Sequence, residues 1–239
     1  MILPRHPGRP VARSVTVAGL AVVGLLLSGC GGSLGIHPGS AAVIGDDTLT
    51  MDKIDGTTTL YCRAYLPQLQ QQGQKLPMRY LRQFVAASLS QRDLGQQLAD
   101  QYAVQPTSQY QDHLNQVAQQ FATAAPDVKQ AVLDVEGGSA YLQTIQVAIG
   151  EKLLAESGTP TTKTKAALQR GEVATQDWLR THPVSIDPVF GVGVDGGAFQ
   201  AVHAQTSYPL SALASAGAAD TSQPDPTYTA ALTPGQLCG

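Results

Sequence analysis

Three cysteines, Cys30, Cys62 and Cys238, are the side chains best suited to covalent chemistry in this chain. A thiol can carry a lipid, form a disulfide or bind a metal, and its surroundings decide which of these it does. Cys30 follows residues 1–14, which are basic and contain no acidic residue, and residues 15–27, which are apolar or small. This order is typical of a secretory signal peptide. The apolar run is shorter than the about 20 residues that a membrane-spanning helix needs. We therefore expect residues 1–29 to be a signal peptide.

Residues 27–30 read LSGC and resemble the lipobox of bacterial lipoproteins, which is Leu, a small residue, Gly or Ala, and Cys. The resemblance implies cleavage just before Cys30, diacylglycerol on its sulfur, and a protein held on the extracytoplasmic face of the cell membrane. Two or more acyl chains give stable anchoring. Residues 30–40 are rich in Gly, Ser and Pro and would form a flexible tether. The alternative is an ordinary secretory signal followed by a cysteine that occurs there by chance.

The other two cysteines are expected to pair. With Cys30 assigned to lipid, Cys62 and Cys238 would lie outside the cytosol, where two cysteines are more often paired than free. A Cys62–Cys238 disulfide would tie the C-terminal tail to an early helix. The alternative is two free thiols. A metal site is not expected, because neither cysteine has His partners at ligand spacing.

No histidine has surroundings that favour catalysis. His113 lies among Gln and Asn and is interpreted as a solvated surface residue, and His203 has no obvious partner. His182 precedes a proline at a predicted helix end, where a polar or cationic side chain is favourable. The sequence contains no nucleophile elbow and no phosphate-binding loop. We therefore predict neither enzyme activity nor a cofactor.

The charge balance limits the partners. The chain has 15 basic and 18 acidic residues, and three of the basic ones precede Cys30. An acidic body argues against nucleic acid or anionic lipid headgroups as main partners, because both need a basic surface. The length after Cys30 suits one ordinary domain.

Apolar spacing predicts a mainly helical body. Residues 41–50 suggest strand, turn and strand, and Thr50 is a plausible N-cap for a helix that Pro67 would kink or end. Further helices are predicted over 77–103, 107–124, 126–157 and 162–180. Gly137 and Gly138 would kink or split the fourth of these five helices.

The chain after the helices has a different character. Residues 184–186 alternate between apolar and polar, which is the period of a strand. The rest, up to residue 239, is rich in Gly, Ala, Pro, Ser and Thr. It suggests strand and loop, with a weakly ordered section near 214–226.

These pieces, in this order, resemble the SurA N-terminal domain family. Its opening strand, polar turn and Thr- or Ser-capped helix correspond to residues 41–50. Its closing pattern, Val-x-Val-x-Pro-x-Tyr/Phe-Gly, is matched by Val184, Ile186, Pro188, Phe190 and Gly191.

The resemblance implies a bundle of about five helices with a small strand pair formed by the N-terminal and post-helical segments. It covers residues 41–195 and leaves 196–239 as an extension that the disulfide would pin. Relatives often carry an inserted parvulin-type isomerase domain. No segment of that character lies between residues 103 and 181, so isomerase activity is not expected.

The resemblance also implies chaperone-like binding of unfolded or extended segments of exported proteins. The candidate client-binding groove is formed by apolar residues of the second and third predicted helices: Leu81, Phe84, Val85, Leu89, Tyr110 and Leu114. The same stripe suits a helical core, so both interpretations stay open. An alternative from another class is a structural or adaptor lipoprotein that binds one folded cell-envelope partner.

Overall fold

The computed structural model describes residues 38–202, 209–218 and 225–239. All of them belong to the second of two compact units, Ser33–Gly239. The expected signal peptide, Cys30, the tether up to residue 37 and His203 lie outside the described residues. Within the described part, no helix combines the length and the hydropathy that crossing a membrane requires.

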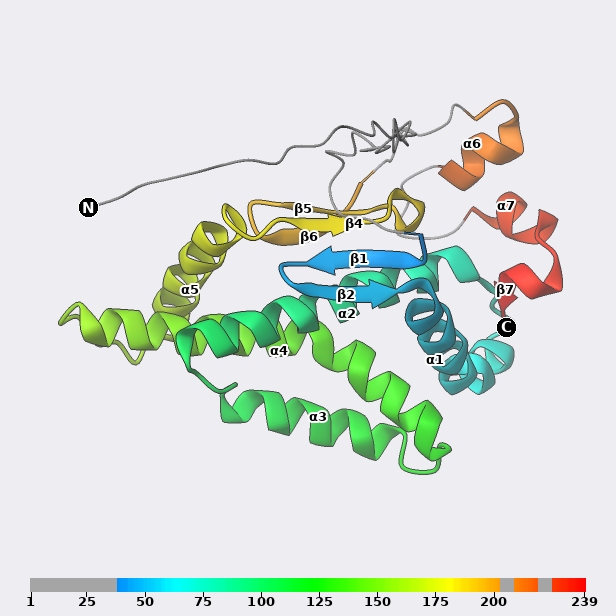
Figure 1. The fold of residues 1–239 in the computed structure, drawn as a ribbon. Coiled ribbons are helices and arrows are strands. Elements are labelled where there is room, and N and C mark those ends of the chain that lie inside the picture. Colours follow the sequence, from blue (N-terminus) through cyan, green and yellow to red (C-terminus); the bar gives the residue numbers. More distant parts are fainter. Residues whose placement is uncertain (1–37, 203–208, 219–224) are drawn as a thin grey trace, which may run out of the picture. The chain divides into compact units, whose positions relative to one another are not determined.

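The described chain is mainly α-helical, as expected (Figure 1). Five long helices make up most of it: α1 (Met51–Gln71), α2 (Met78–Tyr102), α3 (Ser108–Gln120), α4 (Pro126–Glu156) and α5 (Thr164–Leu179). All five were predicted, with ends that differ by a few residues. Two short helices follow, α6 (Ala212–Ala218) and α7 (Pro226–Ala231), together with two 3₁₀ turns, η1 (Pro188–Phe190) and η2 (Pro234–Gln236).

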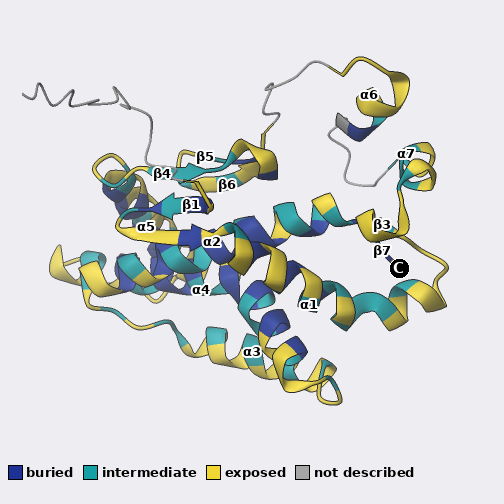
Figure 2. Ribbon diagram, turned by 45° about the vertical axis from the view of Figure 1, so that its right-hand side comes forward, coloured by how far each residue is buried: buried dark blue, intermediate teal, exposed yellow. Residues whose placement is uncertain are grey.

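Helix α4 is the centre of the bundle, because it packs against α1, α2, α3 and α5. Its buried residues include Val132, Val135, Ile145 and Ile149. Figure 2, coloured by burial, shows dark blue, buried stretches on α4. Gly137 and Gly138 do not split it: α4 is one continuous helix. Instead, Gly138 lets α2 approach, since a Cβ there would lie 2.1 Å from the carbonyl oxygen of Ser88. The glycine pair therefore allows close packing against α4 and does not interrupt the helix.

Helices α4 and α5 also meet through glycine. A Cβ on Gly171 would lie 1.8 Å from the carbonyl oxygen of Gln146, and one on Gly150 would lie 1.8 Å from that of Ala167. Each glycine thus faces the backbone of the opposite helix. The two helices come closer than any side chain at these positions would allow.

The expected strand pairing is confirmed. Strand β1 (Ser40–Ile44) forms a hairpin with β2 (Asp47–Thr50) and pairs on its other side with β4 (Val184–Ile186), antiparallel in both cases. Ala42 lies opposite Ile186. Gln97 of α2 donates a hydrogen bond to the carbonyl of Ile44, which holds the hairpin against the helices. Thr50 caps α1 by accepting a hydrogen bond from the amide of Lys53 at 3.1 Å.

The C-terminal segment returns to the start of the bundle. Its last strand, β7 (Leu237–Cys238), pairs with β3 (Leu76–Pro77) between α1 and α2. Cys62 and Cys238 form the expected disulfide, which spans 176 residues of sequence. The tail is therefore attached to α1 covalently and to the start of α2 by backbone hydrogen bonds.

Three expectations need correction. Pro67 does not end α1, which continues to Gln71. The expected boundary between residues 195 and 196 falls inside a hairpin of β5 (Val192–Asp195) and β6 (Ala198–Ala201), because Gly196 and Gly197 both adopt positive φ and form its turn. The extension predicted as strand and loop contains α6 and α7. Helix α7 begins after Asp225, whose carboxylate accepts hydrogen bonds from two amides of the first turn.

One half-buried acid predicts a pH dependence. Burial, together with the nearby Asp47 carboxylate, raises the pKa of Asp93 on α2 from 3.8 to about 6. Between these two values the folded state holds the proton more tightly, so the free energy of unfolding falls as pH rises from about 4 to 6. The charges of Arg92 and Lys53 oppose this shift.

We expect Asp93→Asn to raise the free energy of unfolding at neutral pH by about 1–2 kcal/mol. This gain is smaller than the roughly 3 kcal/mol that corresponds to the full shift of the Asp93 pKa, because solvent reaches part of the side chain. Urea titrations at neutral pH and near pH 4 measure the difference, which should vanish at the lower pH. Asp112→Asn, on the exposed surface of α3, is the control. An equal gain at both pH values would contradict the assignment.

Candidate functional site

A hollow with an almost entirely apolar lining lies between α1, the first turns of α2 and the disulfide-linked tail. Its volume is about 280 Å³. Four of its residues are aromatic, three are leucines and the last is a cysteine of the disulfide. We call this site the aromatic pocket, and it is lined by Tyr61, Tyr65, Leu69, Leu76, Tyr80, Leu81, Phe84 and Cys238.

Helical spacing places these side chains together. Tyr61, Tyr65 and Leu69 are four residues apart on α1 and therefore share one face. Tyr80, Leu81 and Phe84 belong to the first two turns of α2. The Tyr61 ring lies 4.9 Å from the Tyr65 ring and 5.9 Å from the Phe84 ring, measured between centroids. These are contact distances for tilted aromatic pairs.

A carboxylate behind the pocket orients both tyrosines of α1. The Tyr61 and Tyr65 hydroxyls donate hydrogen bonds to the same oxygen of Glu136 on α4, at 2.8 Å for Tyr65. Burial, and then the hydrogen bond to Glu136, raise the pKa of Tyr61 far above its ordinary value. Burial also raises the pKa of Tyr65 to about 12. Both phenols therefore stay protonated at neutral pH, with their polar ends directed at Glu136.

Phe84 gives the pocket an open side. Its side chain is 45% exposed, although it lies on a helix whose next residue, Val85, is fully buried. The other large apolar side chains of α2 are buried or half-buried, so Phe84 is the exposed one on this helix. A ligand could therefore reach the apolar surface at Phe84 without any helix moving.

The six predicted groove residues do not form one surface, so that prediction is wrong as a set. Val85 and Leu89 are buried in the core, where an i, i+4 stripe places them. Leu81 is buried but lines the aromatic pocket, together with exposed Phe84.

Tyr110 and Leu114 lie elsewhere. Both are half-buried on α3 and approach α4 at Gly137, where a Cβ would touch them. Tyr110 contacts the Tyr141 ring edge-on, with centroids 5.0 Å apart. These two residues fasten α3 to α4.

Two of the histidines make structural contacts. The His182 ring stacks on Trp178 with centroids 4.2 Å apart, and its Nδ1 lies 3.1 Å from the Trp178 carbonyl oxygen at the end of α5. The expected role at a helix C-terminus is confirmed. His113 is half-buried, with its Nε2 3.0 Å from the carbonyl oxygen of Glu136, so it is not the solvated surface residue that was expected. Over the described ranges, no group of three His, Cys, Asp or Glu side chains is arranged to hold a metal ion.

Sequence reasoning missed five residues as parts of a site: Tyr61, Tyr65, Leu69, Leu76 and Tyr80. A signal was present, because three of the eight tyrosines and one of the four phenylalanines fall within residues 61–84. In a chain with only 5% aromatic residues, such clustering marks a local aromatic surface. The spacing alone did not show that Cys238 closes its end.

Comparison with known proteins leaves the fold and the pocket as the basis for function. No family model matches the chain, and neither a curated protein nor a solved structure matches it.

Proposed function

We propose that this chain is a lipid-anchored extracytoplasmic protein that binds extended, apolar-bearing segments of exported proteins in a chaperone-like manner. The observation that carries the proposal is the aromatic pocket, which offers apolar surface at Phe84 on an otherwise well-packed bundle. The signal-like residues 1–29 and the lipobox-like LSGC support the location. The strand pairing of β1 with β4 is the arrangement that the resemblance to the SurA N-terminal domain implies.

The pocket suits a transient binder of polypeptide. Aromatic walls accept many apolar side chains, because contact with a ring does not depend on an exact hydrogen-bond pattern. Burying one such side chain contributes about 1.5–3 kcal/mol. A single pocket of this kind therefore holds a segment weakly and releases it, as a holding chaperone must.

Substitution of Phe84 tests the proposal. We expect the protein to suppress aggregation of an unfolded client. Phe84→Ser removes the exposed ring and its apolar contact with the client. We expect this loss to weaken client binding about tenfold, which corresponds to roughly 1.4 kcal/mol. Light scattering measures suppression, and fluorescence anisotropy of a labelled unfolded client measures affinity. Phe84 is on the surface, so the variant should fold, which circular dichroism checks.

Val173→Ser is the matched control. Val173 is 46% exposed on α5 and does not line the aromatic pocket. The substitution removes an equally exposed apolar side chain, so it should leave client affinity unchanged. If both variants weaken client binding equally, non-specific contact with exposed apolar side chains explains the binding, and the aromatic pocket is not the binding site. If the wild type shows no suppression at several-fold molar excess, the proposed function is wrong.

A further inference from the structure

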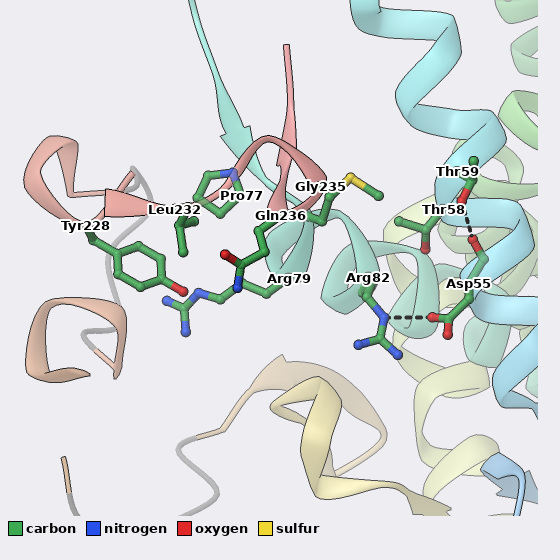
Figure 3. A pocket seen from close by; sticks show the side chains of 11 residues that line it. Asp55, Thr58, Thr59, Pro77, Arg79, Arg82, Tyr228, Leu232, Gly235 and Gln236 are labelled. Carbon is green, nitrogen blue, oxygen red and sulfur yellow. Dashed lines mark hydrogen bonds and ion pairs between the residues drawn. The ribbon is translucent and has the colours of Figure 1, made fainter. Parts of the chain in front are cut away.

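A second hollow, more polar than the aromatic pocket, lies between α1, the start of α2 and the C-terminal segment. Its volume is about 400 Å³. Figure 3 shows the Arg79 guanidinium beside Tyr228 and Gln236, and Arg82 turned toward Asp55. We call it the arginine hollow, after Arg79 and Arg82.

Arg79 is held in place without a carboxylate partner. Its Nη2 donates to the Tyr80 hydroxyl at 2.7 Å, and its guanidinium carbon lies 4.4 Å from the Tyr80 ring centre and 5.1 Å from that of Tyr228. Among the described residues, no acidic side chain comes within salt-bridge distance of it. Stacking on two rings thus limits the motion of a guanidinium that keeps most of its donors free.

The remaining charges in the hollow set its selectivity. Arg82 donates from Nε to Asp55 at 2.7 Å, so this pair is internally neutralised. The hollow then has one excess positive charge, on Arg79. That single charge matches the single negative charge of a carboxylate. The planar guanidinium also matches a carboxylate in a two-bond arrangement.

The rest of the lining is both apolar and polar. Met78, Leu232 and the Tyr228 ring supply apolar contact next to Arg79. The Gln236 side-chain oxygen accepts from the backbone and hydroxyl of Thr233, which leaves its NH₂ group free to donate within the described part of the chain. A cation, an amide donor and an apolar wall are the groups that recognise an apolar residue carrying a free carboxylate.

We propose that the arginine hollow binds the C-terminal residue of a polypeptide, with its carboxylate on Arg79 and its apolar side chain against Met78 and Leu232. This rests on the proposed function, because the ligand is again an exported polypeptide. It adds a preference for free chain ends over internal segments. Such ends are produced by proteolysis and by termination of synthesis.

The test uses the full-length protein and two fluorescein-labelled hexapeptides that end in leucine, one as the free acid and one as the amide. We expect the amide to bind about tenfold more weakly, which corresponds to roughly 1.4 kcal/mol, because an amide cannot form the hydrogen-bonded ion pair with Arg79. Arg79→Gln should remove the difference between the two peptides. Arg63→Gln, which alters an exposed arginine of α1 that does not line the hollow, should preserve it.

Equal affinity for acid and amide, or a difference that survives in Arg79→Gln, would overturn the proposal. Competition by phosphatidylglycerol vesicles as effective as that by the free acid would instead assign the hollow to lipid headgroups, and would also overturn it. The aggregation assay separates the two proposals. If Arg79→Gln suppresses aggregation normally and the peptides do not differ, only the chain-end inference falls, whereas failure of the wild type to suppress aggregation removes the proposed function.

Discussion

Replacing Gly171 by alanine is expected to lower the free energy of unfolding by about 3 kcal/mol, although alanine is the better helix former. The new Cβ would lie 1.8 Å from the Gln146 carbonyl oxygen, and no side-chain rotation can relieve a contact with backbone. Helices α4 and α5 must separate or tilt, which opens the core around Ile149 and Trp178. Urea titration followed by circular dichroism measures the loss. Gly150→Ala should behave in the same way.

Gly56→Ala is the matched control for this prediction. Gly56 is an exposed residue of α1, and a Cβ added to it would have no atom within 4 Å. The same substitution there should stabilise the protein by up to about 1 kcal/mol through helix propensity alone. A Gly171→Ala protein as stable as the wild type would mean that the two helices do not cross at this distance in solution.

Loss of the Cys62–Cys238 disulfide is expected to lower the free energy of unfolding by about 2–4 kcal/mol. The bond closes a loop of 176 residues, for which the chain-entropy model gives about 5 kcal/mol, and measured values are usually smaller. The double variant Cys62→Ala/Cys238→Ala, compared with the wild type with and without dithiothreitol, measures the effect by urea titration. Reductant should destabilise the wild type and leave the double variant unchanged.

The same variant also tests how the tail is held. Over residues 209–218 and 225–239, the only strand pairing is between β7 and the two residues of β3. Without the disulfide we therefore expect faster amide hydrogen exchange at Leu237 and at position 238 than in the core of α4. The aromatic pocket would then lose the residue that closes its end. Unchanged stability and unchanged exchange in the variant would show that backbone pairing alone fixes the tail.

Much of the fold could be predicted from local patterns. The i, i+4 spacing of Leu81, Val85 and Leu89 identifies α2 and its core face, and Thr50 marks the start of α1. The alternation of Val184 and Ile186 identifies the strand that pairs with β1. These features depend on residues close in sequence, or on an order of elements that resembles a known family. One amino-acid sequence is therefore enough to predict them.

The remainder depends on contacts between distant segments. Phe84 and Leu81 look alike in a helical stripe, yet one is 45% and the other 7% exposed, because the position of α1 decides which side is covered. Gly138 looks like a helix breaker until α2 is known to pass beside it. Gly196 and Gly197 are typical turn residues, but the hairpin around them is hard to predict because β6 is short and mostly exposed.

The disulfide also sets an order in time. Cys62 leaves the ribosome 176 residues before Cys238, which at roughly 5–20 residues per second is a wait of about 10 to 35 s. Helices α2, α3, α4 and α5 are synthesised during that interval, and α1 can pack against them before the covalent partner of Cys62 exists. The aromatic pocket and the arginine hollow both need residues of the tail. Neither site can therefore form until residues 225–239 have been synthesised, and the end of the aromatic pocket is fixed covalently only once Cys238 has been oxidised.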